Sequence, residues 1–248
     1  MIYIGTSGWS YGDWADGIFY PKDLREKDWL KFYSQHFKTV EVNATFYHQM
    51  KAQTFANWRQ ITPRNFVFSV KISRFLTHVK KLNQPKEPWQ RFIGNAKYLK
   101  EKLGPILIQL SPNFKANLVK LENLLKIIPR KFQVALEVRD DSWFCDDIYQ
   151  ILKKYNCALV FADSQEWPSL VRRDLRISPT ADFIYIRMHG PGDLYGSKYT
   201  TAHLKNVAEK IKQWQKKIKE IYVYFNNDTR GYAVDNAKKL EKLVRINN

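Results

Sequence analysis

The chain has 248 residues, of which 44% are hydrophobic and 15% aromatic, with ten glycines and ten prolines. This composition is typical of a folded globular protein and excludes an intrinsically disordered or collagen-like chain. The formal net charge of +17 suits either an acidic partner, such as nucleic acid or a phosphorylated metabolite, or a lysine-rich surface that keeps the protein soluble.

The sequence has no recognisable membrane span or secretion signal. No apolar run approaches the roughly 18 residues that a membrane span needs, and residues 1–5 lack the basic and apolar regions of a secretion signal. The two cysteines, Cys145 and Cys157, have no second cysteine or histidine at zinc-finger spacing, and two cysteines make no disulfide framework. We therefore expect a cytoplasmic protein.

Strand and helix patterns alternate along the chain. The predicted strands open residues 2–9, start again at Val40, and then occupy residues 66–72, 106–110, 132–139, 157–163, 183–189 and 221–226. The predicted helices occupy residues 24–37, 54–61, 89–103, 117–128, 148–155, 201–218 and 234–244.

Such alternation predicts parallel strands joined by right-handed crossovers. Eight units in about 250 residues fit one (β/α)8 TIM barrel. A doubly wound open sheet is the alternative, but the first strand is not followed by the Gly-x-Gly-x-x-Gly turn that many such sheets use to bind dinucleotides. The sequence therefore predicts the α/β class and a single barrel domain spanning residues 1–248.

Polar residues fall on one face of several predicted strands, near their carboxyl ends. From Val40 onward, Val40, Val42 and Ala44 share one face, and Glu41 and Asn43 lie on the other. Active sites of TIM barrels lie where the carboxyl ends of the strands open, at the mouth of the barrel. The same parity predicts that the mouth contains Ser7, Glu41, Asn43, Ser69, Lys71, Gln109, Glu137, Arg139, Asp163, Tyr185, Arg187, His189, Tyr222, Tyr224 and Asn226.

Several motifs carry a family likeness. They are Thr6-Ser7-Gly8-Trp9-Ser10-Tyr11, Val40-Glu41-Val42-Asn43-Ala44-Thr45-Phe46-Tyr47, Glu137-Val138-Arg139-Asp140-Asp141-Ser142-Trp143, Tyr185-Ile186-Arg187-Met188-His189-Gly190 and Tyr224-Phe225-Asn226-Asn227-Asp228. Together they resemble the YecE-like family, domain of unknown function 72, over nearly the whole chain. One departure is Gln109-Leu110-Ser111-Pro112, where family members usually have two prolines. The resemblance implies a TIM barrel and no established reaction.

The favoured hypothesis is an enzyme, hydrolase- or isomerase-like, that acts on a small phosphate- or sugar-containing molecule at the mouth. Carboxylates and a histidine supply acid–base chemistry, whereas cations, amides and aromatic rings bind anions, hydroxyls and ring faces. The predicted catalytic residues are Glu41, Glu137, His189 and Asp163. The predicted substrate-binding residues are Trp9, Asn43, Tyr47, Lys71, Gln109, Arg139, Trp143, Arg187 and Asn226.

Three alternatives stay open. A divalent metal could bind Glu41, Glu137, Asp163 and His189, although three cations in the same mouth oppose a 2+ ion; no cofactor is predicted. A nucleic-acid-binding or nuclease-like barrel would use the net charge and the basic loop at residues 77–81. A non-catalytic barrel would keep the charges as a structural salt-bridge network. His36, His48 and His203 are expected to be surface or packing residues.

Overall fold

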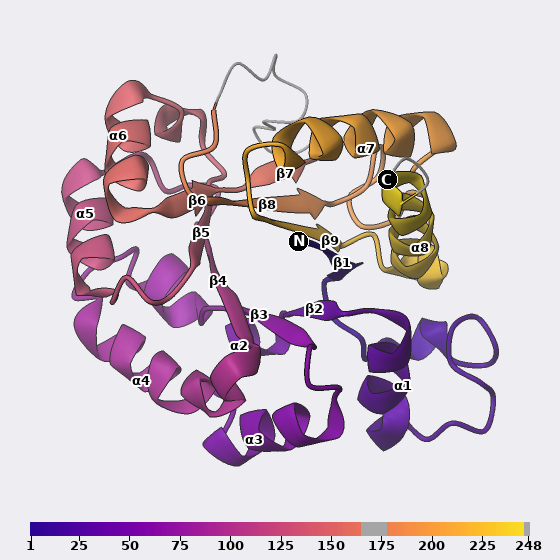
Figure 1. Cartoon of the computed structure of the whole chain (residues 1–248). Helices are drawn as coiled ribbons and strands as arrows, with labels where there is room; N and C mark the ends of the chain where they lie inside the picture. Colours follow the sequence, from indigo (N-terminus) through magenta and orange to yellow (C-terminus); the bar gives the residue numbers. More distant parts are fainter. Residues whose placement is uncertain (165–177, 246–248) are drawn as a thin grey trace.

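Parallel strands run through the centre of the molecule and helices pack around them (Figure 1). The computed structural model describes residues 1–164 and 178–245. The strands are β1 (Ile2–Thr6), β2 (Thr39–Val42), β3 (Val67–Lys71), β4 (Leu103–Gln109), β5 (Val134–Glu137), β6 (Cys157–Leu159), β7 (Phe161–Asp163), β8 (Phe183–Met188) and β9 (Glu220–Phe225). The α-helices are α1 (Trp29–His36), α2 (Ala44–Tyr47), α3 (Ala52–Ile61), α4 (Lys86–Ala96), α5 (Leu118–Ile127), α6 (Asp146–Tyr155), α7 (Thr201–Gln215) and α8 (Tyr232–Arg245).

The strands form two parallel sheets. One has the order β2-β3-β4-β5-β6 and the other the order β1-β9-β8-β7. Helical segments separate most consecutive strands, as the alternation in the sequence predicts; β6 and β7 follow each other directly, and the connection after β7 includes residues outside the described part. The fold is thus α/β with parallel sheets, an arrangement consistent with a TIM-like fold.

The two sheets meet at β1 and β2 without a ladder of backbone hydrogen bonds between the two strands. The Tyr33 hydroxyl connects them instead, because it accepts from the Thr6 amide at 3.0 Å and donates to the Thr39 carbonyl at 3.1 Å. Gly5 allows this close approach, since a Cβ at this position would lie 2.3 Å from the Thr39 carbonyl oxygen.

A second junction lies in the sixth predicted strand. The structure divides residues 157–163 at Val160 into β6 and β7, and each half pairs with a different sheet. The apolar run on both sides of Val160 hides this break from the sequence.

Two layers of apolar side chains pack on either side of the strands. The outer layer fills the space between strands and helices and includes Val40, Phe68 and Val223. The inner layer is smaller and consists of Leu107, Ala135, Ala158, Val160, Ala162, Phe183, Tyr185, Tyr222 and Tyr224. Because Tyr185 and Tyr224 are in it, the inner layer touches the polar residues two positions further along the same strands.

Several element boundaries differ from the prediction by a few residues, and two of the differences change the type of element. The strand that starts near Val40 ends at Val42, and residues 44–47 form the short helix α2. Asn43 already has right-handed helical angles, and the Thr45 hydroxyl donates to the Val42 carbonyl at 3.1 Å, so the chain turns there. The helix predicted for residues 89–103 is divided into α4 and a 3-10 segment, Lys97–Lys102, in which Lys100 has φ of 52°.

Candidate functional site

Arg187 on β8 is the centre of a buried ion-pair network. Its side chain is 1% exposed, and it contacts two carboxylates from the other sheet. Nη2 and Nε bind Glu41 at 2.7 and 3.0 Å, and Nη1 binds Glu137 Oε2 at 2.6 Å. The period-two pattern brings these three side chains together, because β2, β5 and β8 all present the same face to the interior.

Arg139 supplies a second cation to the same network. It follows β5, and its Nη2 and Nε donate to Glu137 Oε1 at 2.9 and 3.1 Å. Burial alone would raise the pKa of Glu137, but Arg187 and Arg139 outweigh it and hold that pKa well below its ordinary value. Glu137 therefore stays ionised, and two carboxylates balance two guanidinium groups.

His189 closes the network on the side of β9. It is fully buried, with Nε2 3.4 Å from Glu137 Oε1 and Nδ1 3.1 Å from the Asn226 amide nitrogen. Burial lowers its pKa to about 4, and the charge of Arg187 acts in the same direction. At neutral pH, His189 is thus an uncharged hydrogen-bonding group.

Neutral polar groups complete the surroundings of Arg187. Gln109 accepts from its Nη1 at 3.4 Å, and the Tyr185 hydroxyl donates to Glu41 Oε2 at 2.6 Å. Burial, followed by the charge of Glu41, raises the pKa of Tyr185 well above its ordinary value. Tyr185 therefore acts as a donor, and the two Glu41 oxygens are occupied by Tyr185 and Arg187.

Lys71 at the end of β3 differs from the other cations. It is 6% exposed, and its Nζ lies 4.0 Å from the ring centre of Phe46. Within the described residues, no carboxylate lies close enough to form an ion pair with Lys71 and no side chain accepts from it. Burial lowers its pKa to about 7, and Arg187 adds to this lowering, whereas Glu137 and Glu41 oppose it.

His78 lies beside the same aromatic ring and was not among the predicted site residues. It belongs to a π-helical turn, Phe75–Val79, and its ring meets the edge of Phe46 at 5.0 Å between centres. Its Nδ1 is 2.8 Å from the Thr77 hydroxyl. Burial and then the charge of Lys71 lower its pKa to about 4. A π-helical turn is itself a frequent mark of a functional position, but the sequence does not reveal it.

Asp163 does not join this network. Its carboxylate faces α7, where His203 Nε2 lies 3.2 Å from Oδ2, and Arg187 makes its ion pairs with Glu41 and Glu137. Ala162, its neighbour on β7, belongs to the inner apolar layer, so the alternating geometry places Asp163 on the helix-facing side. The inward placement expected for Asp163 is wrong, and His203 has an acidic contact that the sequence did not indicate.

The three aromatic residues predicted to contact a substrate differ in how open their rings are. Trp143 is fully buried, and its indole nitrogen donates to the Phe114 carbonyl at 2.5 Å, so neither face is open for stacking. Trp9 packs edge-on against Trp58 at 5.1 Å between ring centres. Tyr47 on α2 is exposed. Of the three predicted aromatic contacts, Tyr47 therefore presents the most open ring.

The Asn43 side chain is half-buried, and only its amide nitrogen has a hydrogen-bond partner in the described part of the chain. Its amide nitrogen donates to the Ser7 carbonyl at 3.3 Å, whereas its side-chain oxygen and the Ser7 hydroxyl are buried without a hydrogen-bond partner in the described part of the chain. Buried polar atoms of this kind are uncommon and are often completed by a bound molecule or water. This pair borders the end of β2, next to Glu41.

Neither a metal-binding cluster nor a membrane span occurs in the described part of the chain. No three His, Cys, Asp or Glu side chains within residues 1–164 and 178–245 are grouped in a way that could hold a metal ion. No helix in the same ranges combines the length and the apolar character needed to cross a membrane.

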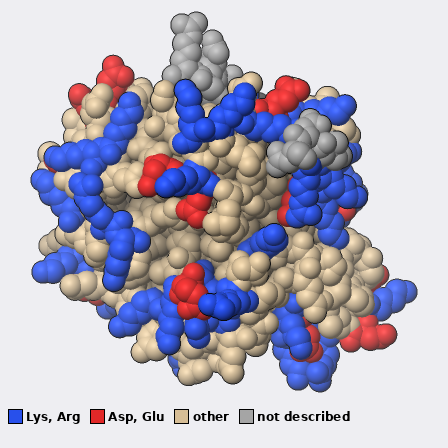
Figure 2. All heavy atoms as spheres, viewed as in Figure 1, with Lys and Arg blue, Asp and Glu red and all other residues tan. Residues whose placement is uncertain are grey.

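Basic side chains are spread over the face shown in Figure 2, with acidic ones between them. They do not gather in one continuous stripe on this face. On this face, the positive charge is therefore dispersed and does not form a single basic patch.

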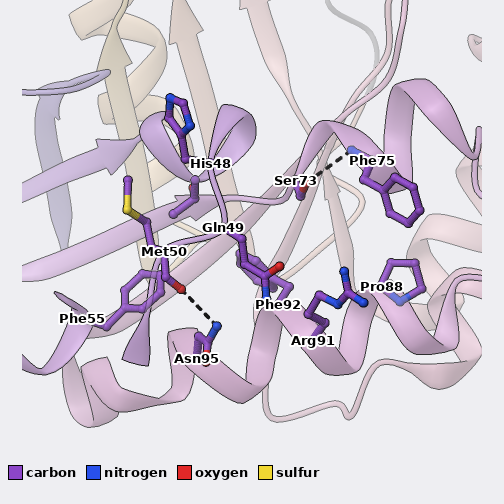
Figure 3. Close-up of a pocket in the computed structure, with 11 residues that line it drawn as sticks. His48, Gln49, Met50, Phe55, Ser73, Phe75, Pro88, Arg91, Phe92 and Asn95 are labelled. Carbon is purple, nitrogen blue, oxygen red and sulfur yellow. Dashed lines mark hydrogen bonds between the residues drawn. The ribbon is translucent and has the colours of Figure 1, made fainter. Parts of the chain in front are cut away.

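A small cavity lies between α3, α4 and the segments that follow β2 and β3 (Figure 3). Its volume is about 110 Å³, and most of its lining is apolar, with Met50, Phe55 and Phe92 as large members. The Asn95 amide donates to the Met50 carbonyl at its edge at 3.0 Å (Figure 3). None of the ion-paired residues of the network lines it, so the cavity and the charged mouth are separate features.

Comparisons of the sequence and of the structure with known proteins point to the same family. Residues 3–248 match the family described as protein of unknown function DUF72. UPF0759 protein YunF of Bacillus subtilis (strain 168) is 29% identical over 282 residues, which cover 99% of this chain and 95% of YunF. A DUF72 family protein of Thermotoga maritima MSB8 with a crystal structure is 31% identical, with a TM-score of 0.87 and coverage of 98% of this chain and 99% of that one. A DUF72 family protein of Enterococcus faecalis V583 shares the fold at 22% identity, with a TM-score of 0.83 and coverage of 100% and 97%.

Proposed function

The chain belongs to the DUF72 family, whose description assigns no activity, and we propose that it is an enzyme acting on a small, polar, phosphate- or sugar-containing molecule. This membership confirms the family resemblance drawn from the sequence motifs. The proposed architecture is one (β/α)8 barrel domain, in which the two sheets close on each other. Its site is the mouth formed by the carboxyl ends of β2, β3, β5, β8 and β9.

Lys71 is the observation that carries the proposal. It is a buried amine without a paired carboxylate in the described residues, and its pKa of about 7 lets it gain or lose a proton at neutral pH. A general acid or base works best when its pKa is close to the working pH. A buried charge without a counterion is costly, so a purely structural role would favour an apolar side chain here.

The carboxylates have a supporting role in this proposal. Glu137 is held by two guanidinium groups and keeps a low pKa, which makes it a poor proton acceptor at neutral pH. Glu41 binds Arg187 and Tyr185. The network therefore fixes the walls of the mouth, and the proton transfers of a hydrolase- or isomerase-like reaction fall to Lys71 with a bound water or His78.

Substrate recognition in this proposal uses the rim. Lys71, Arg139, Gln109 and Asn226 are each slightly exposed, and they offer charged and neutral donors to phosphate oxygens and hydroxyls. The buried side-chain oxygen of Asn43 adds an acceptor.

Calorimetric titration tests the proposal with three probes: inorganic phosphate, glucose 6-phosphate and free glucose. We expect a phosphate-bearing probe to bind the wild type, and Lys71→Met to weaken binding roughly tenfold or more, as the loss of a charged hydrogen bond does. Lys205→Met, an exposed position on α7, removes the same charge and should leave the affinity unchanged. If the wild type binds none of the three probes, the network is structural and the proposal fails. The proposal fails too if Lys71→Met binds the phosphate-bearing probes as tightly as the wild type does.

A further inference from the structure

Among the described residues, two lysine side chains, Lys71 and Lys102, are buried, and their surroundings are opposite. The Lys102 ammonium donates to the Arg59 carbonyl at 2.6 Å, the Thr62 carbonyl at 2.7 Å and the Thr62 hydroxyl at 3.0 Å. All three of its protons have acceptors, which is what a structural buried ammonium requires. The Lys71 Nζ lies 4.0 Å from the centre of the Phe46 ring and has no hydrogen-bond acceptor in the described part of the chain.

Charge counting explains why the Lys71 amine is stable without its proton. Glu41 and Glu137 are offset by Arg187 and Arg139, which form three ion pairs of 2.6 to 2.9 Å with them. A protonated Lys71 is therefore an excess charge beside two guanidinium groups. A lysine that is desolvated or placed next to other cations is the usual form of an amine nucleophile.

We propose that Lys71 is a Schiff-base nucleophile, and that the molecule bound in the mouth is a small aldehyde or ketone with an anionic or hydroxylated tail. The inference rests on the proposed function, because it concerns the same site, and it goes further by naming the reacting atom and the carbonyl class of the substrate. The Phe46 ring covers one side of Nζ and limits its hydration.

The chemical step balances without a further reactant. The Nζ lone pair attacks the carbonyl carbon, a C–N bond forms as the C=O π bond opens, and one Nζ proton passes to the carbonyl oxygen, which gives a carbinolamine. The hydroxyl of the carbinolamine then leaves as water with the second Nζ proton, and the nitrogen lone pair completes the C=N bond of an imine between Lys71 and the substrate carbon. His78, which shares the Phe46 ring with Lys71 and is uncharged at neutral pH, is a titratable group outside the ion-pair network with which such protons could be exchanged. The other ionisable groups that act on Lys71 are Glu41, Glu137, Arg139 and Arg187.

Reductive trapping tests this inference. The full-length protein is treated at pH 7 with dihydroxyacetone phosphate and cyanoborohydride, and the modified lysine is found by mass spectrometry of its peptides. With a pKa of about 7, Lys71 has about 10³ times the neutral fraction of an exposed lysine, so we expect it to be labelled at least roughly tenfold faster than the other lysines. Lys71→Arg should remove this fast label, and Lys102 should react slowly in both proteins.

A second probe separates the reactive amine from the recognition of the anion. Dihydroxyacetone has the same carbonyl without the phosphate, so slower labelling by it measures the contribution of the anionic tail. The rate for Lys71 should rise with pH up to about 7 and then level off, whereas exposed lysines continue to gain rate up to about 10.

Labelling and calorimetry together distinguish this inference from the proposed function. Equal labelling of Lys71 and exposed lysines overturns the Schiff base, but the proposed function survives that result if phosphate-bearing probes still bind in calorimetry. Fast labelling of Lys71 with no difference between the two triose probes supports the nucleophile and overturns the anionic tail.

Discussion

Arg187 compensates two buried carboxylates at once, and this makes it a poor choice for a functional mutation. Glu41 and Glu137 lie 2.7 and 2.6 Å from its guanidinium, and all three side chains are at most 1% exposed. Removing one partner from a buried ion pair leaves an uncompensated charge in a medium of low polarity.

We expect Arg187→Ala to lower the free energy of unfolding by about 3–5 kcal/mol, as measured by urea unfolding at pH 7. The double variant with Arg187→Met and Glu41→Gln removes one charge of each sign and should recover most of the loss, because Glu137 keeps Arg139 as its cation. If Arg187→Ala unfolds at the same urea concentration as the wild type, the network does not stabilise the fold in this way.

His189 makes stability depend on pH. Its pKa of about 4 in the folded chain lies below the ordinary value of about 6.5, so the unfolded chain binds a proton in this range before the folded chain does. The stability that His189 contributes is present above pH 6.5 and is lost as the pH falls toward 4.

Urea unfolding of the wild type at pH 7 and pH 4.5 should therefore differ by about 2–3 kcal/mol through His189. His189→Gln keeps a hydrogen-bonding side chain without this titration and should lose that part of the difference. The pKa of His78 is lowered to about 4 too, so His78→Gln is a second test and should remove a share of the pH dependence of its own. A pH dependence that is unchanged in His189→Gln would contradict the assignment.

The sequence predicted the ion-paired residues of the network correctly and misplaced Asp163. Glu41, Glu137 and Arg187 were placed together because alternation is clear in their strands, where apolar side chains fill the opposite face. Asp163 was misplaced because residues 157–162 are apolar on both faces, so period two cannot be read there. The lowered pKa of Lys71 could not be predicted either, because it depends first on burial and then on the charge of Arg187 from β8, and both follow from the three-dimensional packing.

At the scale of elements, the junction of β1 and β2 depends on Gly5. We expect Gly5→Ala to destabilise the fold by several kcal/mol in thermal or urea unfolding, because its Cβ would lie 2.3 Å from the Thr39 carbonyl oxygen and 3.1 Å from the Tyr33 hydroxyl. The overlap is with backbone, so a change of rotamer cannot relieve it.

Gly94→Ala on α4 is the matched control. No atom lies within 4 Å of the place that a Cβ would take at Gly94, and alanine favours a helix by up to about 1 kcal/mol over glycine. Equal and small effects of the two substitutions would show that the strands can separate at this junction at little cost.

The sequence predicted which segments form strands and helices, but it predicted the residues at which they begin and end less well. The alternation identified all eight strand regions because each is an apolar run bounded by turn residues. The end of β2 was missed because Ala44 and Phe46 continue the apolar content of the strand while the backbone turns at Asn43. The break at Val160 and the π-helical turn at residues 75–79 follow from packing between sheets and loops, which local sequence does not encode.

At the scale of the whole molecule, the +17 charge predicts weak and unspecific attraction to nucleic acid. Basic side chains are dispersed on the face in Figure 2, and phosphate contacts alone carry no sequence information. We expect duplex DNA of any sequence to bind at low salt and to be released steeply as salt rises, in a fluorescence anisotropy titration. Binding that persists at physiological salt and depends on sequence would favour the nucleic-acid alternative over a small-molecule enzyme.

The pairing of β1 with β9 has a consequence for how the protein is made. Within the described residues, β1 has a ladder with β9 alone, so its backbone hydrogen bonds cannot form until residues 220–225 have been synthesised. Contacts between such distant segments form slowly, because a long loop must close before they stabilise anything. During synthesis, β1 is thus without its ladder partner until residues 220–225 emerge, and the close approach of Gly5 and Tyr33 to Thr39 provides an earlier contact with β2.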